Sequence, residues 1–333
     1  MARQGFRIGR DRQPALDIVS YGRRGPGHPA VFTPAQLAQI ARTVRRTPEV
    51  MVKVSGGGST PGAVAGHFQY VSRNGELDME TGDGDRVHGT DEVKSLVEDW
   101  GLDLDAMTDR DNYRKRGGRT PTPKLVHNIV LSMPARTPPE KLLDASRAFA
   151  REEFGLQNRY ALVLHTDQDH PHVHLVVSAH RLEGGRLNIR KADLRRYREQ
   201  FARQLRAHGL AANSTPAQIR GRLSDHQKDG IYRAAQRGTS RVEWQREARA
   251  AKAASDPDAS LGVRRIVETK ESVRRDWLRT EAALERQGLA GLAAEVERFR
   301  HSLRVPMTKL ERAELALRRV QAERPPQQLE MVR

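Results

Sequence analysis

Residues 160–180 read YALVLHTDQDHPHVHLVVSAH and hold five of the twelve histidines of this 333-residue chain. Apolar and β-branched residues flank a polar centre, a pattern typical of two strands joined by a turn. We place the turn at Gln168–Pro171 and pair Asp167 with His172, which sets His165 opposite His174. Because side chains alternate between the faces of a strand, these four polar residues should share one face. The opposite face would carry an apolar core surface made of Leu162, Leu164, Val173, Leu175 and Val177.

Three imidazoles and a carboxylate on one polar patch indicate a divalent metal site. Imidazole suits Zn, Mn, Fe, Ni and Cu, and a nearby carboxylate or phosphate oxygen also admits Mg and Mn. The alternatives are a purely structural metal site and a polar sheet face without an ion. His170, in the turn, and His180, further along the chain, are left out of the expected ligand set.

The composition is that of a soluble, strongly charged protein, with 37% hydrophobic residues and a mean hydropathy of −0.72. No apolar stretch is long enough to span a bilayer and no signal peptide opens the sequence, so we expect no membrane insertion. The absence of cysteine excludes disulfides and thiolate metal sites. It fits a cytoplasmic location.

The net charge of +16 is unevenly distributed along the chain. Residues 1–48 carry nine basic and two acidic residues, and residues 186–333 carry thirty-three and nineteen. The middle, residues 49–185, has sixteen basic and twenty-one acidic residues. Basic segments that flank a slightly acidic middle suggest a polyanionic partner such as DNA. The alternative is an ordinary solvated basic surface.

Hydrophobic periodicity predicts an α+β domain with a central antiparallel sheet and packed helices, followed by a mostly helical basic appendage. Strands are expected at 50–54, 125–133, on both sides of the histidine turn and at 187–189. Helices are expected at 61–74, 90–100, 140–154 and 191–208. Residues 76–89 are acidic and glycine-rich and should end in a loop, and residues 108–123 should form a basic loop. We divide the chain into a basic flexible arm (1–48), a core domain (49–212) and a basic helical region (213–333). A short helix near 34–46 and helices at 266–287 and 307–323 complete the expectation.

The helix expected at 61–74 displays one tyrosine. Its apolar stripe is Val64, Phe68 and Val71, while His67, Tyr70 and Asn74 share another face at helical spacing. Tyr70 should therefore point away from the core of the domain.

At this point the sequence resembles a known family. The segment HTDQDHPHVHLVV (165–177) is similar to the third motif of conjugative relaxases of the mobilisation-protein and T-DNA border endonuclease type, within the His-hydrophobe-His nucleases. Residues 50–75 resemble the first motif of that family, in which a tyrosine precedes Ser-Arg-x-Gly. Residues 127–155 resemble its middle strand and helix. Two departures are the fifty or so residues before the first motif and Ser178, where many members carry Asn.

The resemblance implies a relaxase-type palm fold and a role for each matching residue. Tyr70 takes the place of the nucleophile, and His165, His172 and His174 take the places of the metal ligands. Asp167 matches the acidic position and would orient an imidazole or accept the tyrosine proton. A divalent ion, Mg²⁺ or Mn²⁺, would act on the scissile phosphate.

The implied activity is site- and strand-specific nicking of DNA at a transfer origin through a covalent 5′-phosphotyrosine, in conjugative transfer or mobilisation. The implied partners are single-stranded DNA, accessory DNA-binding proteins and a type IV secretion coupling protein, with export attached to DNA as a further expectation. Three alternatives stay open: a rolling-circle replication initiator, a non-catalytic DNA-binding accessory protein, and a metal-dependent hydrolase that uses water.

Overall fold

The computed structural model describes residues 31–102, 104–107, 109, 123–221, 229–242, 244, 245, 248 and 261–303. The chain divides into two compact units, residues 47–214 and the combination of residues 1–46 with 215–333. The first unit contains the histidine-rich stretch. The described residues 31–46, expected within a separate arm, are part of the second unit.

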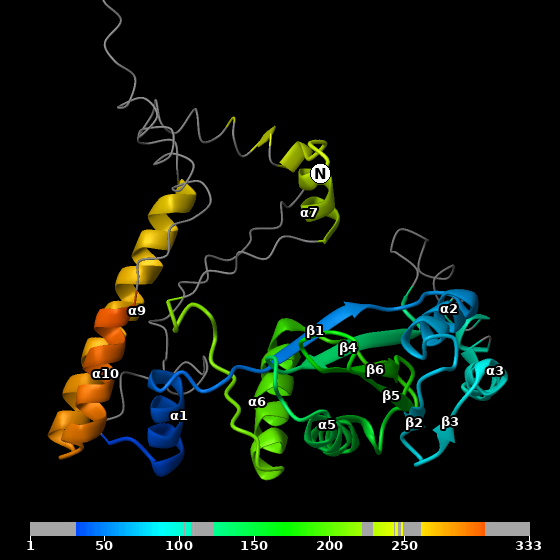
Figure 1. Cartoon of the computed structure of the whole chain (residues 1–333), viewed down its shortest axis with the longest axis horizontal. Coiled ribbons are helices and arrows are strands. Elements are labelled where there is room, and N and C mark those ends of the chain that lie inside the picture. The colour runs from blue at the N-terminus through cyan, green and yellow to red at the C-terminus, as the bar shows by residue number, and fades with distance from the viewer. Residues whose placement is uncertain are drawn as a thin grey trace, which may run out of the picture. The chain divides into compact units, whose positions relative to one another are not determined.

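The first unit is built on a six-stranded antiparallel sheet with the strand order β1-β4-β6-β5-β2-β3 (Figure 1). The strands are β1 (Met51–Gly56), β2 (Met79–Thr81), β3 (Arg86–Val87), β4 (Val126–Ser132), β5 (Tyr160–His165) and β6 (His172–Ser178). The two histidine-bearing strands, β5 and β6, thus lie in the middle of the sheet. This architecture confirms the predicted α+β fold.

Helices cover both faces of the sheet. On one face lie α5 (Pro139–Phe154) and α6 (Lys191–Ala207), whose aromatic residues Phe149, Tyr197 and Phe201 pack on one another and on the sheet. On the other face, α2 (Pro61–Val71) and α3 (Thr90–Asp99) enclose a second core. The apolar residues expected to back the histidines belong to the first core: Leu162, Leu164, Val173, Leu175 and Val177. That prediction is confirmed.

Helix α2 has sharp signals at both ends. Thr60 caps its start by accepting a hydrogen bond from the Ala63 amide, and Pro61 occupies the first turn. After Ser72 the backbone enters the left-handed region for three consecutive residues. Their φ angles are 53° at Arg73, 57° at Asn74 and 86° at Gly75. A Cβ at Gly75 would lie 2.4 Å from the Gly89 carbonyl carbon, so only glycine fits there.

Three sequence-based expectations for secondary structure were wrong or incomplete. Residues 76–89, expected as an acidic, glycine-rich segment that ends in a loop, contain the short strands β2 and β3, of which β2 pairs with β5 and extends the sheet. Residues 187–189 form no strand, although the Leu187 amide donates to the Ala179 carbonyl. Helix α10 (Ala290–Ser302) was not anticipated. The helix expected at 307–323 and most of the basic loop expected at 108–123 lie outside the described residues.

All regular elements that the structure describes in the second unit are helices. Helices α1 (Pro34–Val44), α9 (Leu261–Arg286) and α10 share a core around the fully buried Trp277, whose indole N–H donates to the Ile219 carbonyl. Helix α7 (Asp229–Gln236) lies between α1 and α9 in the sequence. The helices expected near 34–46 and 266–287 correspond to α1 and α9. In the described parts of the chain, no helix combines the length and apolar character needed to cross a membrane.

Candidate functional site

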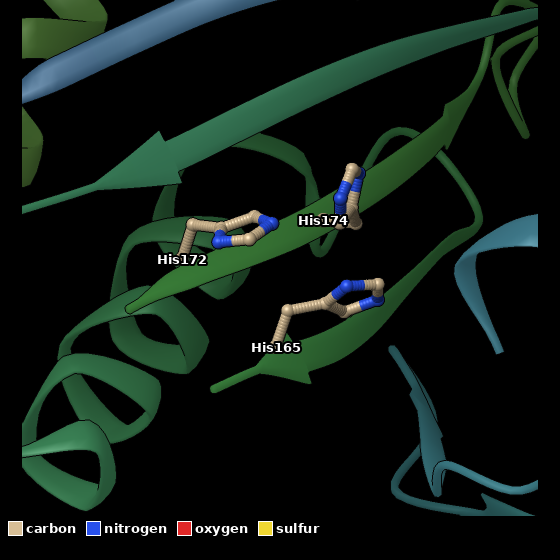
Figure 2. A group of neighbouring side chains, drawn as sticks. All are labelled: His165, His172 and His174. Atoms are coloured by element: carbon tan, nitrogen blue, oxygen red, sulfur yellow. The ribbon is translucent and has the colours of Figure 1, made fainter. Parts of the chain in front are cut away.

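The three histidines of strands β5 and β6 converge on one point (Figure 2). Ligand nitrogens from His165, His172 and His174 all lie within 4.8 Å of one another. The ring centroids of His165 and His174 are 4.5 Å apart, and each lies 5.1 Å from that of His172. The structure thus brings together the three residues predicted as metal ligands.

The pairing that we predicted for these strands was wrong by two residues. His165 pairs with His172, and His174 pairs with Val163. The connection is therefore the six residues 166–171, and Asp167 lies in this loop, outside the strands. A slip of two residues keeps every side chain on its original face, whereas a slip of one would have reversed it. The histidines consequently still share a face, while Asp167 loses its expected place opposite His172.

Main-chain carbonyls accept a hydrogen bond from one nitrogen on two of the rings. His165 donates from Nε2 to the Val71 carbonyl at 2.6 Å, which leaves Nδ1 as its acceptor nitrogen. His172 donates from Nδ1 to the His170 carbonyl at 3.2 Å, which leaves Nε2. A second hydrogen bond of this kind fixes both the tautomer and the ring orientation of metal-binding histidines. The buried Nδ1 of His174 has no hydrogen-bond partner among the described residues.

The environment of His165 and His174 favours their neutral forms. Burial, followed by the neighbouring His165 and His172, lowers the pKa of His174 to about 3. Burial also lowers the pKa of His165, whose side chain is only 1% exposed, against the opposing effect of its hydrogen bond to Val71. A metal ion binds the neutral imidazole, so a low pKa keeps the ligands available at neutral pH.

Tyr70 lies at the carboxyl end of α2 with its side chain 60% exposed, as its helix face predicted. Contacts of the nearby residues Val71 and Arg73 relate the position of Tyr70 to that of the histidines. The Val71 carbonyl accepts the hydrogen bond from His165, and the Arg73 guanidinium lies 5.5 Å from the Tyr70 ring centroid. The predicted nucleophile and the predicted metal ligands thus occupy one surface of the first unit.

Asp167 is bound to an arginine. Its Oδ2 lies 2.5 Å from Nη2 of Arg73, and its Oδ1 lies 3.8 Å from Nδ1 of His165. The pKa of the Asp167 carboxyl is lowered, and the hydrogen bond from Arg73 is the main cause. A carboxylate with a lowered pKa is a weaker base, so this environment favours an orienting role over proton abstraction.

Two further residues at this site had no role assigned from the sequence. Arg73 contacts Asp167 and lies 3.5 Å from Nδ1 of His165. His67 stacks on Tyr70 with ring centroids 6.2 Å apart, and its buried Nε2 has no partner among the described residues. Burial lowers the pKa of His67. The signals in the sequence were the Ser-Arg-x-Gly motif for Arg73 and the face shared with Tyr70 for His67.

The two histidines excluded from the ligand set lie away from the three rings. His170 is exposed in the 166–171 loop. His180 lies between Asp105 and Asp109, at 3.3 and 3.2 Å, and Asp109 also pairs with Arg186. This second cluster ties the segment after α3 to the end of the sheet.

Residues 88–210 match the family model described as "Relaxase: MobA/VirD2-like, nuclease domain". This part of the chain is thus similar to the nuclease domain of MobA/VirD2-like relaxases. The matched range contains the three histidines and Asp167, and Tyr70 precedes it. The resemblance noted from the sequence is thereby confirmed.

The chain is also similar in sequence to T-DNA border endonucleases. The T-DNA border endonuclease VirD2 of Rhizobium radiobacter is 28% identical over 191 residues, which cover 52% of this chain and 43% of that protein. The protein of the same name from Rhizobium rhizogenes is 26% identical over 151 residues, covering 41% of this chain and 32% of that protein. The chain spans less than half the length of these curated relatives.

A solved structure also resembles the chain weakly. It is described as "Molecular Basis of Vancomycin Resistance Transfer in Staphylococcus aureus" and aligns with a TM-score of 0.32 at 11% identity. The alignment covers 51% of this chain and 99% of that one.

Proposed function

We propose that this protein is a DNA relaxase that nicks one strand of DNA at a specific sequence of a transfer origin. The observation that carries the proposal is the convergence of three imidazoles on the surface that also holds an exposed tyrosine. The relaxase family match and the T-DNA border endonucleases among its relatives support the same activity. The proposed substrate is single-stranded DNA at the origin.

The donor set of the histidines fits a divalent metal ion. His165, His172 and His174 would hold it through one nitrogen each, and the unpartnered Nδ1 of His174 suits a group that binds an ion. Nitrogen ligands favour Mn²⁺ over Mg²⁺, because Mg²⁺ prefers oxygen ligands. When bound, the ion would neutralise negative charge on the scissile phosphate and on the leaving oxygen.

Tyr70 is the proposed nucleophile. Its hydroxyl oxygen forms a bond to phosphorus while the bond between phosphorus and the 3′ oxygen breaks. The phenol proton passes to solvent, which reaches the exposed side chain, and the 3′ oxygen takes up a proton. The products are a 5′-phosphotyrosine and a free 3′ hydroxyl. One phosphate ester replaces another, so the reverse reaction can rejoin the strand.

Asp167 is proposed to act through Arg73. Oδ2 of Asp167 lies 2.5 Å from Nη2 of Arg73 and so holds the guanidinium near the proposed nucleophile. The lowered pKa of the Asp167 carboxyl makes this carboxylate a poor acceptor for the phenol proton. Accessory DNA-binding proteins and a type IV secretion coupling protein are the proposed partners. We propose that the protein acts in the cytoplasm and that export would occur with the protein attached to DNA.

The decisive experiment uses labelled single-stranded oligonucleotides that tile the DNA around the gene, incubated with the protein and Mn²⁺. We expect one oligonucleotide to give a protein–DNA band that resists denaturation, and EDTA to remove it. Cleavage without this band would favour a hydrolase that uses water. Binding without cleavage would favour an accessory protein. An adduct formed only at a replication origin would favour a rolling-circle initiator.

A further inference from the structure

Arg73 joins the separate parts of the candidate site. Its guanidinium lies 5.5 Å from the ring centroid of Tyr70, 2.5 Å from Oδ2 of Asp167 and 3.5 Å from Nδ1 of His165. Thus one cationic side chain stands between the proposed nucleophile, a carboxylate and a proposed metal ligand. A substrate phosphate that approaches both Tyr70 and the histidines must come close to this cation.

The backbone at Arg73 adopts a conformation that arginine disfavours. Its φ of 53° lies in the left-handed region, which glycine and asparagine tolerate far better. The chain leaves α2 at Ser72 and turns back at this point, so the guanidinium reaches Tyr70 and Asp167. Strained backbone of this kind is often found at functional sites, where the surrounding structure maintains it.

Arg73 has donors to spare for a phosphate. A guanidinium carries five N–H groups in a planar fork that matches the oxygens of a phosphate. Asp167 engages Nη2 from a loop and is itself 49% exposed, so the ion pair is screened by water. An incoming phosphate could therefore share or displace the carboxylate at small cost.

We propose that Arg73 binds the scissile phosphate and stabilises the charge that develops on it during attack by Tyr70, with Asp167 holding the guanidinium in place before DNA arrives. This inference rests on the proposed nicking reaction and adds a phosphate-binding catalytic residue to it. The ligand class is a phosphodiester of single-stranded DNA.

The left-handed backbone allows substitutions that remove the cation without disturbing the fold. Arg73→Asn and Arg73→Gly place better-suited residues at this φ, so neither variant should unfold at a lower temperature than the wild type. Arg136 is a matched control, because it is an exposed arginine of the same unit with a φ of 68°. Arg136→Asn makes the same chemical change at the same kind of backbone position.

The first measurement is the single-turnover rate of adduct formation with saturating oligonucleotide and Mn²⁺. Loss of one preorganised group that stabilises transition-state charge slows a reaction by about 100-fold or more. We expect this loss in Arg73→Asn and Arg73→Gly and a rate near that of the wild type in Arg136→Asn. Added methylguanidinium should restore part of the rate of Arg73→Gly. A wild-type rate in either Arg73 variant would overturn the proposal.

The second measurement does not depend on cleavage. The salt dependence of oligonucleotide binding is recorded in EDTA, where one lost phosphate contact reduces the slope of log affinity against log salt by about 0.7 on single strands. We expect this reduction in Arg73→Asn and not in Arg136→Asn. An unchanged slope together with a slow rate that methylguanidinium cannot rescue would make Arg73 a structural residue and refute the inference. A wild-type protein that forms no adduct would refute the nicking reaction, whereas the slope would still decide whether Arg73 binds phosphate.

Discussion

His165 on β5 donates a hydrogen bond of 2.6 Å from Nε2 to the main-chain carbonyl of Val71, the last residue of α2. The acceptor residue, Val71, directly follows Tyr70 in the chain. One short contact therefore orients a proposed metal ligand and fixes the helix end that carries the proposed nucleophile. Both halves of the site depend on it.

Tyr70→Phe should abolish the covalent adduct and leave the fold and DNA binding intact, because it removes only an exposed hydroxyl. Denaturing gel electrophoresis with labelled oligonucleotide measures the adduct. Tyr232→Phe is the matched control, since Tyr232 is also exposed and should not matter. An adduct that persists in Tyr70→Phe would identify another tyrosine, such as Tyr21 or Tyr113, which lie outside the described residues.

His172→Ala and His174→Ala should each remove cleavage and weaken Mn²⁺ binding. Loss of an outer-shell partner alone typically costs about 10- to 100-fold in metal affinity, so loss of a direct ligand should cost at least that much. Titration calorimetry with Mn²⁺ measures the effect, and His170→Ala in the exposed loop serves as the control. Unchanged Mn²⁺ affinity in both ligand variants would rule out the three-histidine site.

The metal-free protein should lose stability as the pH falls from about 6.5 towards 3. The folded-state pKa of His174 is about 3 against an ordinary 6.5, so in this window the unfolded chain binds more protons than the folded one. Between pH 7 and 4.5, His174→Gln should reduce the change in the free energy of unfolding by at most about 2–3 kcal/mol. Urea unfolding in EDTA at the two pH values measures it. An equal pH dependence in wild type and His174→Gln would show that His174 titrates normally.

Asp167→Asn separates the two roles considered for this carboxylate. If Asp167 orients Arg73, the adduct should form more slowly but still appear, because the guanidinium remains. If Asp167 were the proton acceptor, the variant should be as inactive as Tyr70→Phe. Stability should change little, since the ion pair is exposed. Single-turnover rates of the two variants, measured side by side, distinguish these roles.

Nearly all of the excess positive charge lies outside the unit that holds the site. Residues 47–214 carry 24 basic and 23 acidic residues, whereas the chain as a whole has a net charge of +16. A protein restricted to residues 47–214 should therefore bind oligonucleotides more weakly and with a shallower salt dependence. It should still cleave them at saturation. Equal salt slopes for the truncated and full-length proteins would indicate that the flanking segments serve partners other than DNA.

The sequence predicted the sheet, its packed face and the three converging histidines, because alternation along a strand keeps the same side chains on one face when the register shifts by two residues. It did not predict the pairing of His165 with His172, since the length of the polar connection leaves several registers open. Arg73 had no assigned role for a different reason. Its position follows from three successive left-handed residues, of which Asn74 and Gly75 favour this conformation whereas Arg73 itself carries no signal of it.

The six-residue connection between β5 and β6 carries Asp167, but it does not determine the positions of His165 and His172, which border it. His165 and His172 are held by main-chain pairing in the middle of the sheet, where strands open only when the domain unfolds. Glycines inserted into this connection would therefore displace the carboxylate and leave the spacing of the imidazoles unchanged. Such insertions should thus alter the reactivity of the proposed nucleophile without altering the affinity of the proposed metal site, although the two lie only a few side chains apart.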